Sequence, residues 1–552
     1  MPLIQRDALA PDIRGKSGAE LLDQALELGP RGISRLSCED FFWLVRKIGP
    51  DDCIPLLELA STEQWQYLLD LELWGGDMPR VERISFWIER FQRADPVRLT
   101  RWLFTEGELL AHYHLYKSLD VVMDVGDEGA PKGEGFFTLD GVFHIRVRDP
   151  RYRESLESLI RTMAEVDLNR YQALMTGLSA VLPAELEEEL YRLRNARLAE
   201  HGFLPYEEAV SIYSPLEPAF LKRMEGATAD PVVRDPQAPV TIPTIPLLLG
   251  GAGNLFLQAA MGVDDPLFAD RLRLEFAGLA NQLLAADGLQ SPDTDDLIAS
   301  CRRGARILNL GLEILSGRDP AAGRRLLERY PLTSVFRVAY GMVLKVKREA
   351  ERWEAGSWFR ARGLDVTFWA ERWGGTLKGL LKRRPLFFTG QEDEQMRDFE
   401  WLGEVRQCTR ILRRLMVVDG LLEVLARSCP PGQDGIAPLE DTYDRLLVTY
   451  WGRMSLGLGP TFEGLTVEQA RDLLARLRSR EGSPPYTMEA FGSNFVRDLC
   501  GCLPTPDPET EALLKETLGS VWEAFCDEYS RIPLDRLDGR YSRTLRIIHS
   551  RT

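Results

Sequence analysis

The sequence predicts a mainly α protein, with helical-hairpin repeats at its N-terminus, a small β-hairpin insert and a larger helical C-terminal half. Three patterns lead to this prediction. Apolar residues recur at helical spacing through most of the chain, as the leucines of residues 185–200 do. Only the stretch 121–147 alternates or clusters β-forming residues. Proline- and glycine-rich segments separate the periodic stretches and mark the joints between them.

The N-terminal region carries a weak internal repeat with an offset of 43 residues, because Trp43–Ile48 aligns with Phe86–Phe91. A period of about 40–47 residues is typical of the helix–turn–helix units of α-solenoids. Ser61 and Thr105 each begin a four-residue pattern that resembles a capping box, which would open a further helix in each copy. The alternative is a chance alignment of two amphipathic helices.

The β-forming residues fall into three runs, 121–125, 135–139 and 142–147. Asp140 and Gly141 separate the last two runs and are the favoured residues of a two-residue type I′ turn. An isolated hairpin is marginal in water, so we expect this one to pack on helices or to gain a third strand.

The remaining elements are predicted helices. Residues 185–200 place leucines along one stripe with charges elsewhere, and His201-Gly202 is a plausible end of that helix. Similar periodic stretches predict helices around 269–287, 297–316, 404–428, 465–480 and 511–530.

Five prolines between Asp230 and Pro246 predict an extended linker, where we place the main boundary. The predicted parts are a helical-repeat region (1–120), a β-hairpin insert (121–150), a helical region with a distinctive corner (151–229), the proline-rich linker (230–246) and a C-terminal helical domain (247–552).

The chain has 552 residues, with 68 Lys and Arg against 84 Asp and Glu, and a formal net charge of −16. Nucleic acids and acidic membranes are polyanions, so this charge disfavours broad binding to either. The 8 cysteines are few and scattered, which excludes a disulfide scaffold. Residues 1–20 hold no apolar run typical of a secretory signal, so we expect a cytoplasmic protein with reduced thiols.

The uncharged stretch Pro236–Val263 is long enough to cross a bilayer. Its four prolines, and the glycines that follow them, would leave backbone groups unpaired in lipid. We therefore predict an extended arm that enters a buried helix near Leu255, and no transmembrane segment.

The most distinctive string runs from Gly202 to Leu216, with the pattern Gly-Phe-x-x-Tyr-x-Glu-Ala and then Tyr-x-Pro-Leu. Gly202 ends one helix, and helical spacing would place Tyr206 and Tyr213 on one face of the next. Tyr206, Glu208 and Tyr213 are candidate binding residues. The alternative is a helical corner whose tyrosines only pack.

This string resembles an uncharacterised bacterial family of domains of unknown function, and so does the string from Ala280-Asn281 to Ala286-Asp287-Gly288. The resemblance implies a large, mainly helical cytosolic protein. It implies no activity, substrate or catalytic residue.

Residues 344–384 form a basic, aromatic stretch, with 11 Lys and Arg against 5 Asp and Glu. Cations interleaved with tryptophans suit single-stranded nucleic acid, since the cations contact phosphates and the rings stack on bases. An anionic membrane surface or an acidic protein would also fit. In the remaining interpretation the rings are core and the cations pair with the chain's surplus acids. The candidate binding residues are Arg372, Trp373, Lys382, Arg383 and Arg384.

No motif predicts a metal, a cofactor or a catalytic centre. Gly250–Asn254 lacks the Gly-Lys-Ser/Thr of a phosphate-binding loop. His112 and His114 would point to different sides of a helix, and Cys500 with Cys502 lacks a second pair. The sequence therefore favours a cytosolic protein-binding or scaffold protein that uses grooves between stacked helices. Binding of nucleic acid or an anionic ligand through 344–384 is the alternative, and an enzyme with an unrecognised helical active site is the second alternative.

Overall fold

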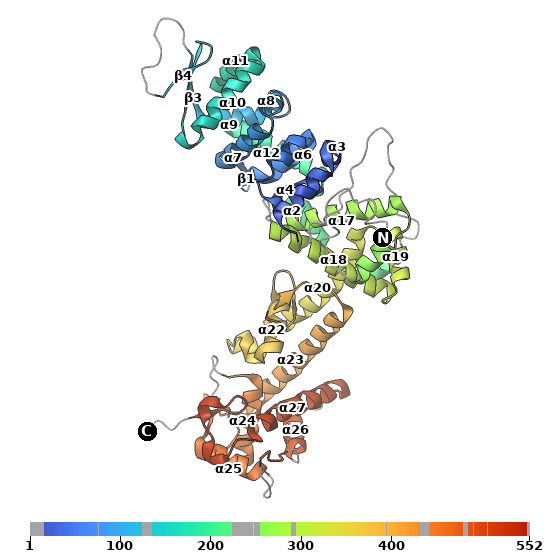
Figure 1. The fold of residues 1–552 in the computed structure, drawn as a ribbon. Helices are drawn as coiled ribbons and strands as arrows, with labels where there is room; N and C mark the ends of the chain where they lie inside the picture. The colour runs from blue at the N-terminus through green and yellow to red at the C-terminus, as the bar shows by residue number, and fades with distance from the viewer. Residues whose placement is uncertain are drawn as a thin grey trace. The chain divides into compact units, whose positions relative to one another are not determined.

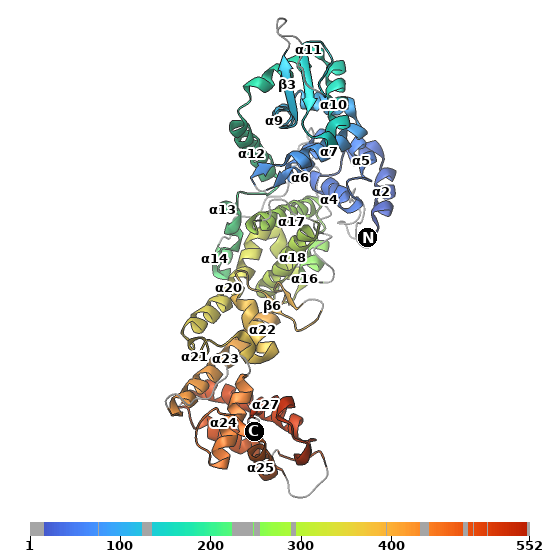
Figure 2. The same ribbon diagram turned by 90° about the vertical axis from the view of Figure 1, so that its left-hand side faces the viewer.

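The computed structural model describes residues 16–75, 77–123, 135–223, 247, 254–288, 294–392, 395–430, 441–478, 484–488, 491–504 and 506–548. It confirms the mainly α fold, since helices make up most of these residues and the strands among them form only small sheets. The chain divides into two compact units, unit 1 (Met1–Gly341) and unit 2 (Met342–Thr552) (Figure 1 and Figure 2).

Unit 1 begins with a stack of short helices around large aromatic side chains. Trp65 is fully buried, and its ring centroid lies 4.4 Å from that of Phe91. The indole Nε1 of Trp65 donates to Leu57 O at 2.8 Å, so this buried polar atom is satisfied. The elements are α2 (Gly18–Glu27), α3 (Gly29–Ile33), α4 (Cys38–Ile48), α5 (Ile54–Leu59), α6 (Thr62–Glu72), β1 (Trp74–Gly75), β2 (Met78–Pro79), α7 (Val81–Ala94), α8 (Pro96–Leu103) and α9 (Glu108–Ser118).

One of the two predicted capping boxes is confirmed and the other is wrong. The side chain of Gln64 accepts from Ser61 N at 2.7 Å, and Ser61 Oγ accepts from Gln64 N, so α6 begins as predicted. Thr105 caps no helix, because α9 has Gly107 as its N-cap. The Thr105 hydroxyl instead donates back to Arg101 O at 2.9 Å, at the end of α8.

The β insert is an antiparallel sheet of β3 (Leu119–Met123), β4 (Phe137–Thr138) and β5 (Phe143–Val147), in the order β3–β5–β4. The third strand provides the support that an isolated hairpin lacks. The sheet lies beside α10 (Arg153–Val166) and α11 (Leu168–Gly177), as both ribbon views show (Figure 1 and Figure 2).

The predicted two-residue turn at Asp140 and Gly141 is wrong. Thr138 pairs with His144, so the connection between β4 and β5 is longer than two residues. The Asp140 carboxylate accepts from the amide of Phe143 at 3.1 Å, and it thereby satisfies a donor that a tighter turn would have placed in the ladder.

The second part of unit 1 contains longer helices. The predicted helix over 185–200 is confirmed, and it ends at His201 followed by Gly202 with φ +84°. The buried helix expected at Leu255 is also confirmed. The proline-rich segment 230–246 and the glycines at 250, 251 and 253 lie outside the described residues. The elements are η1 (Pro150–Tyr152), η2 (Leu178–Ala180), α12 (Pro183–Glu200), α13 (Tyr206–Ala209), η3 (Val210–Tyr213), α14 (Pro218–Arg223), α16 (Leu255–Met261), α17 (Pro266–Ala286), α18 (Thr294–Ser316), α19 (Pro320–Arg329) and α20 (Leu332–Gly356).

Unit 2 contains the C-terminal part of α20 and the helices that follow it. Trp451, Phe495 and Trp522 form an aromatic cluster with ring centroids 5.3–5.6 Å apart. The other predicted helices are confirmed as α17, α18, α23, α25 and α27. The elements are α21 (Trp358–Ala361), η4 (Val366–Trp369), α22 (Ala370–Leu381), β6 (Phe387–Phe388), β7 (Met396–Arg397), α23 (Leu402–Ser428), α24 (Tyr443–Leu456), β8 (Leu465–Thr466), α25 (Val467–Leu477), α26 (Gly492–Cys500), α27 (Pro508–Tyr529), η6 (Leu534–Arg536), η7 (Gly539–Tyr541) and β9 (Ile547–Ile548). Among the helices of the described ranges, none combines the length and the apolar character needed to cross a bilayer.

Candidate functional site

The two strings that carry the family resemblance lie in contact. The side chain of Asn281 in α17 donates to His201 O, at the end of α12, at 2.6 Å. The Tyr213 hydroxyl donates to Asp287 Oδ1 at 2.8 Å, and Arg303 pairs with the same carboxylate. We call the region of residues 201–216 and 280–288 the signature corner. These hydrogen bonds join the two strings directly.

His201 is held in this corner by a charged partner from α4. Its Nδ1 lies 2.8 Å from Glu39 Oε1, and its ring centroid lies 4.6 Å from that of Tyr67. Burial lowers the pKa of His201, but the hydrogen bond and the charge of Glu39 outweigh burial, so the net pKa is raised. The pair therefore links α4 to the end of α12.

The predicted binding residues of this corner do not form one surface. The chain from Tyr206 to Tyr213 is not one α-helix but the short α13 followed by the 3₁₀ turn η3. Tyr206 is 42% exposed and Glu208 is exposed, whereas Tyr213 packs on Tyr340 with ring centroids 4.8 Å apart.

In the basic, aromatic stretch of unit 2 the largest rings are core. Trp369 is fully buried, Phe359 is buried and Trp358 is 8% exposed. Trp373 is half-buried and stacks on Tyr443, with ring centroids 4.7 Å apart and planes 10° apart. Rings covered in this way offer few faces on which a base could stack.

The cations of the same stretch lie mostly at the surface. Arg372, Lys382 and Arg383 are exposed, and Arg384 is half-buried. Lys345, Arg348 and Arg352 are exposed on α20 and share one face of the helix by their spacing. Lys347 pairs with Glu351 at 2.6 Å and Arg360 with Glu354 at 2.6 Å, so part of the charge is neutralised within the stretch.

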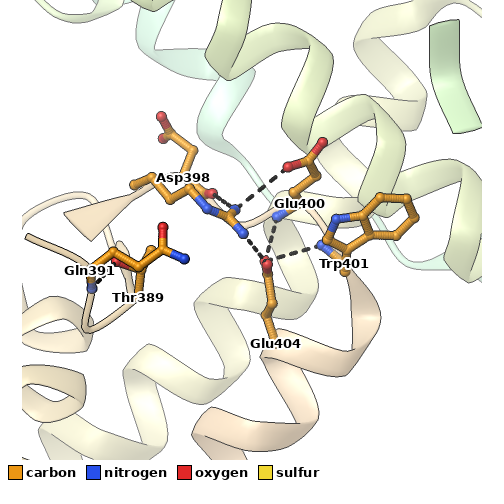
Figure 3. A network of polar contacts seen from close by, with 7 residues as sticks. Thr389, Gln391, Asp398, Glu400, Trp401 and Glu404 are labelled. Atoms are coloured by element: carbon orange, nitrogen blue, oxygen red, sulfur yellow. Dashed lines mark hydrogen bonds and ion pairs between the residues drawn. The ribbon is translucent and has the colours of Figure 1, made fainter. Parts of the chain in front are cut away.

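A polar network fixes the hairpin of β6 and β7 to the start of α23 (Figure 3). The Glu404 carboxylate accepts from the amides of Glu400 at 2.8 Å and Trp401 at 3.1 Å, and it pairs with the Arg397 guanidinium. Arg397 also donates to Asp398 O at 2.9 Å. Glu404 therefore caps a helix and neutralises a cation, which is a structural role.

Two of the groups that could react, the buried thiols and a buried histidine of the described residues, have shifted pKa values. All 8 cysteines lie in the described part of the chain as free thiols, and burial raises the pKa of Cys301 and Cys408 to about 12. Burial lowers the pKa of His114 to about 4. Within the described ranges, no three His, Cys, Asp or Glu side chains gather in a way that could hold a metal ion.

A groove in unit 1 runs beside β3, which is an edge strand of the three-stranded sheet. Residues 119–123 of β3 form one wall, and Met175 of α11 with Leu178 of η2 form the other. Phe143 and Arg148 also line it. We call this cavity of about 380 Å³ the β3 groove; its volume lies within the range of about 300–1,000 Å³ typical of ligand sites.

The backbone of β3 faces this groove with an open edge. Arg148 N donates to Ser118 O at 2.9 Å, so the hydrogen-bonded pairs of the β3–β5 ladder are those of even-numbered β3 residues. The N–H and C=O groups of Val121 and Met123 therefore point away from β5. In the part of the chain that the structure describes, no strand pairs with that edge.

The side chains at the end of β3 leave apolar surface open to solvent. Val122 is 42% exposed and Met123 is 45% exposed. Leu119, Val121 and Met123 share the face of the sheet that looks toward the helices, because side chains alternate along a strand. The β3 groove thus combines an unpaired strand edge with an apolar floor.

Comparison with known proteins places the chain in a family. The sequence profile of one family matches residues 29–547, which is most of the chain. The chain belongs to the family of unknown function DUF6178. No curated protein and no solved structure matches the chain significantly.

The DUF6178 match spans the signature corner, the β3 groove and the basic stretch alike, and it confirms that the family is an uncharacterised one. The sequence pattern predicts the strands of the insert but does not indicate the β3 groove. The available signal was Val121-Val122-Met123, because three successive apolar residues place one apolar side chain on the outer face of a small sheet.

Proposed function

We propose that this DUF6178 chain is a protein-binding protein that takes an extended segment of a partner into the β3 groove. The observation that carries the proposal is the open edge of β3 beside an apolar groove. An unpaired strand edge is a template for a further strand, and a groove between a strand and a helix receives the side chains of that strand.

Two features of the chain support this proposal over the alternatives. The β3 groove pairs backbone donors and acceptors with apolar side chains, which is the chemistry of an extended peptide. At the signature corner, Tyr213, Asn281 and His201 are already engaged with Asp287, the His201 carbonyl and Glu39. We also propose that the helices that precede β3 form repeated hairpins with the 43-residue offset and act as a scaffold for the groove. We also propose a bacterial, cytoplasmic setting, which the 8 free thiols support.

The proposal is tested by affinity capture with a matched pair of variants. Val121→Pro removes an N–H that points away from β5, so it blocks the addition of a strand without breaking the sheet. Val121→Thr keeps the shape and the N–H and serves as the control. We expect the wild type and Val121→Thr to retain the same discrete protein, and Val121→Pro to lose it. Retention by Val121→Pro, or repeated capture of nothing by the wild type, would contradict the proposal.

Binding of nucleic acid through residues 344–384 remains the second candidate, and one observation favours it. Lys345, Arg348 and Arg352 form an exposed cationic stripe on α20. Since Trp358 and Trp369 are buried, we propose that any such contact would run through phosphates and would not read bases. Salt-dependent binding of a labelled oligonucleotide, lost in Arg348→Glu with Arg352→Glu, would support it. An enzyme with an unrecognised helical active site is the third candidate; screening with activity-based probes would test it.

A further inference from the structure

The geometry of the β3 groove also specifies the segment that fits it. We propose that the partner adds to β3 as a strand with an apolar side chain opposite Val121 and acidic side chains on either side of that residue. This inference rests on the proposed function and states the chemistry of the partner.

The register of β3 fixes where the apolar residue belongs. The N–H and C=O of Val121 point away from β5, so a residue of the added strand bonds there. Side chains that face each other across two paired strands lie on the same face of a sheet, whichever way the partner runs. The residue opposite Val121 therefore projects its side chain toward the helices.

The surroundings on that face are apolar. Phe143 is 3% exposed and contacts the ring of Tyr171 edge-on, with centroids 6.3 Å apart. Met175 and Leu178, which form the wall opposite β3, are buried as well. An aliphatic side chain placed there removes its own surface from water together with the exposed parts of Val121 and Met123.

The outer face of the sheet, which looks away from the helices, carries charged side chains. Arg146 Nη2 lies 2.7 Å from Asp120 Oδ2, and Arg148 Nε lies 2.9 Å from Asp120 Oδ1. Both arginine side chains are almost half exposed. Asp120 lies on β3 itself, and the two guanidinium groups reach it from the β5 side, so the three side chains together leave one net positive charge on this face. The partner residues next to the apolar one project onto this face opposite Asp120 and Val122, so carboxylates there complement the net positive charge of the two guanidinium groups.

The experiment uses the full chain and a synthetic peptide, acetyl-Glu-Val-Glu-Leu-Glu-Val-Glu-amide, measured by fluorescence anisotropy. Three matched peptides each change one feature of this peptide. In the first the same residues are sorted into an acidic half and an apolar half. In the second lysine replaces every glutamate. In the third the central leucine is N-methylated, which removes one backbone donor.

We expect the alternating peptide to bind at least about tenfold more tightly than the sorted and N-methylated peptides, because each loses strand pairing. We expect the lysine peptide to bind about fivefold more weakly than the glutamate peptide, which is the upper end for exposed charges. Arg148→Glu should reverse this charge preference. Hydrogen–deuterium exchange should slow at residues 119–123 on binding of the alternating peptide, and Val121→Pro should abolish its binding.

Equal binding of the glutamate and lysine peptides, or of the alternating and sorted peptides, would overturn the inference. A wild-type dimer that Val121→Pro dissociates would overturn it as well, since a second copy would then occupy the groove. If the affinity capture depends on Val121 while no peptide binds preferentially, the proposed function stands and only this inference falls. If neither depends on Val121, both fall.

Discussion

The hydroxyl of Tyr213 donates a hydrogen bond of 2.8 Å to Oδ1 of Asp287, which joins η3 to the residue that ends α17. These two residues belong to the two separate strings that carry the family resemblance. The strings are 74 positions apart in the chain, yet they form one contact. The two strings that carry the family resemblance therefore meet at one contact in the fold.

We predict that Tyr213→Phe lowers the free energy of unfolding by about 1–2 kcal/mol, because a hydrogen bond to a charged acceptor is lost. A double-mutant cycle with Asp287→Ala, measured by urea unfolding, isolates this pair, because alanine has no acceptor for the hydroxyl. We expect a coupling energy of about 1 kcal/mol or more. A coupling energy near zero would show that the bond does not contribute to stability.

The His201–Glu39 pair predicts a pH dependence of stability. The pKa of His201 is raised in the folded protein, so its contribution is complete below about pH 6.5, the usual pKa of histidine. The contribution is lost as the pH rises through the raised value. Urea unfolding across this range should therefore show stability falling, and His201→Gln or Glu39→Gln should flatten that fall. An unchanged profile in both variants would refute this assignment.

The register of β3 predicts opposite effects of proline at neighbouring positions. Val121→Pro should change the free energy of unfolding by less than about 1 kcal/mol, since the N–H of Val121 faces outward. Val122→Pro should lower it by about 3 kcal/mol, because the lost N–H belongs to the ladder with β5. Thermal unfolding, with hydrogen exchange read at residues 143–147, checks both. Similar losses for the two variants would contradict the register.

Asp419 predicts a large stability effect inside unit 2. Its buried carboxylate accepts from the amides of Trp358 at 3.1 Å and Phe359 at 2.9 Å. Asp419→Ala should lower the free energy of unfolding by about 2–3 kcal/mol, because two buried donors lose their acceptor. Asp365, whose exposed side chain caps η4, is the matched control. Asp365→Ala should lower the free energy of unfolding by less than Asp419→Ala does. Chemical denaturation compares them; equal losses would mean that burial of the acceptor is unimportant.

The buried rings of residues 344–384 predict how oligonucleotides interact with unit 2. Any binding should leave tryptophan fluorescence nearly unchanged, because Trp358 and Trp369 are not available for stacking. A plot of the logarithm of the binding constant against the logarithm of the salt concentration should have a slope no steeper than about −2, as expected for about three phosphate contacts. Titration of a single-stranded oligonucleotide at several salt concentrations measures both. Strong quenching with a steeper slope, lost in Arg383→Glu with Arg384→Glu, would contradict this expectation.

Much of the fold follows from local sequence patterns. Helices such as α12, α17 and α23 begin and end where apolar periodicity and end signals place them, because each helix forms its backbone hydrogen bonds within itself. The errors occur where a side chain competes for backbone groups. Thr105 donates to a preceding carbonyl instead of capping α9, and Asp140 accepts amides and lengthens a turn.

The candidate site was less predictable, because it depends on contacts between distant segments. The sequence pattern indicates the tyrosines at 206 and 213, but only the fold shows that Tyr213 donates to Asp287 while Tyr206 is exposed. The β3 groove needs Met175 to lie opposite β3, and no local pattern specifies that approach. Periodicity predicts which residues form a strand, but it does not predict which edge of the strand stays open.

The glycine at the end of α12 makes two demands on the chain at once. Gly202 has φ +84°, and a Cβ built there would lie 2.8 Å from the Cα of Gly278 in α17. A methyl group on Gly202 would collide with the backbone of Gly278 and force the two segments apart, which would strain the hydrogen bonds of Asn281 and Tyr213. The close approach of the two segments at the signature corner therefore depends on the absence of a Cβ atom at Gly202. At position 202 only the hydrogen atom of glycine fits against the backbone of Gly278.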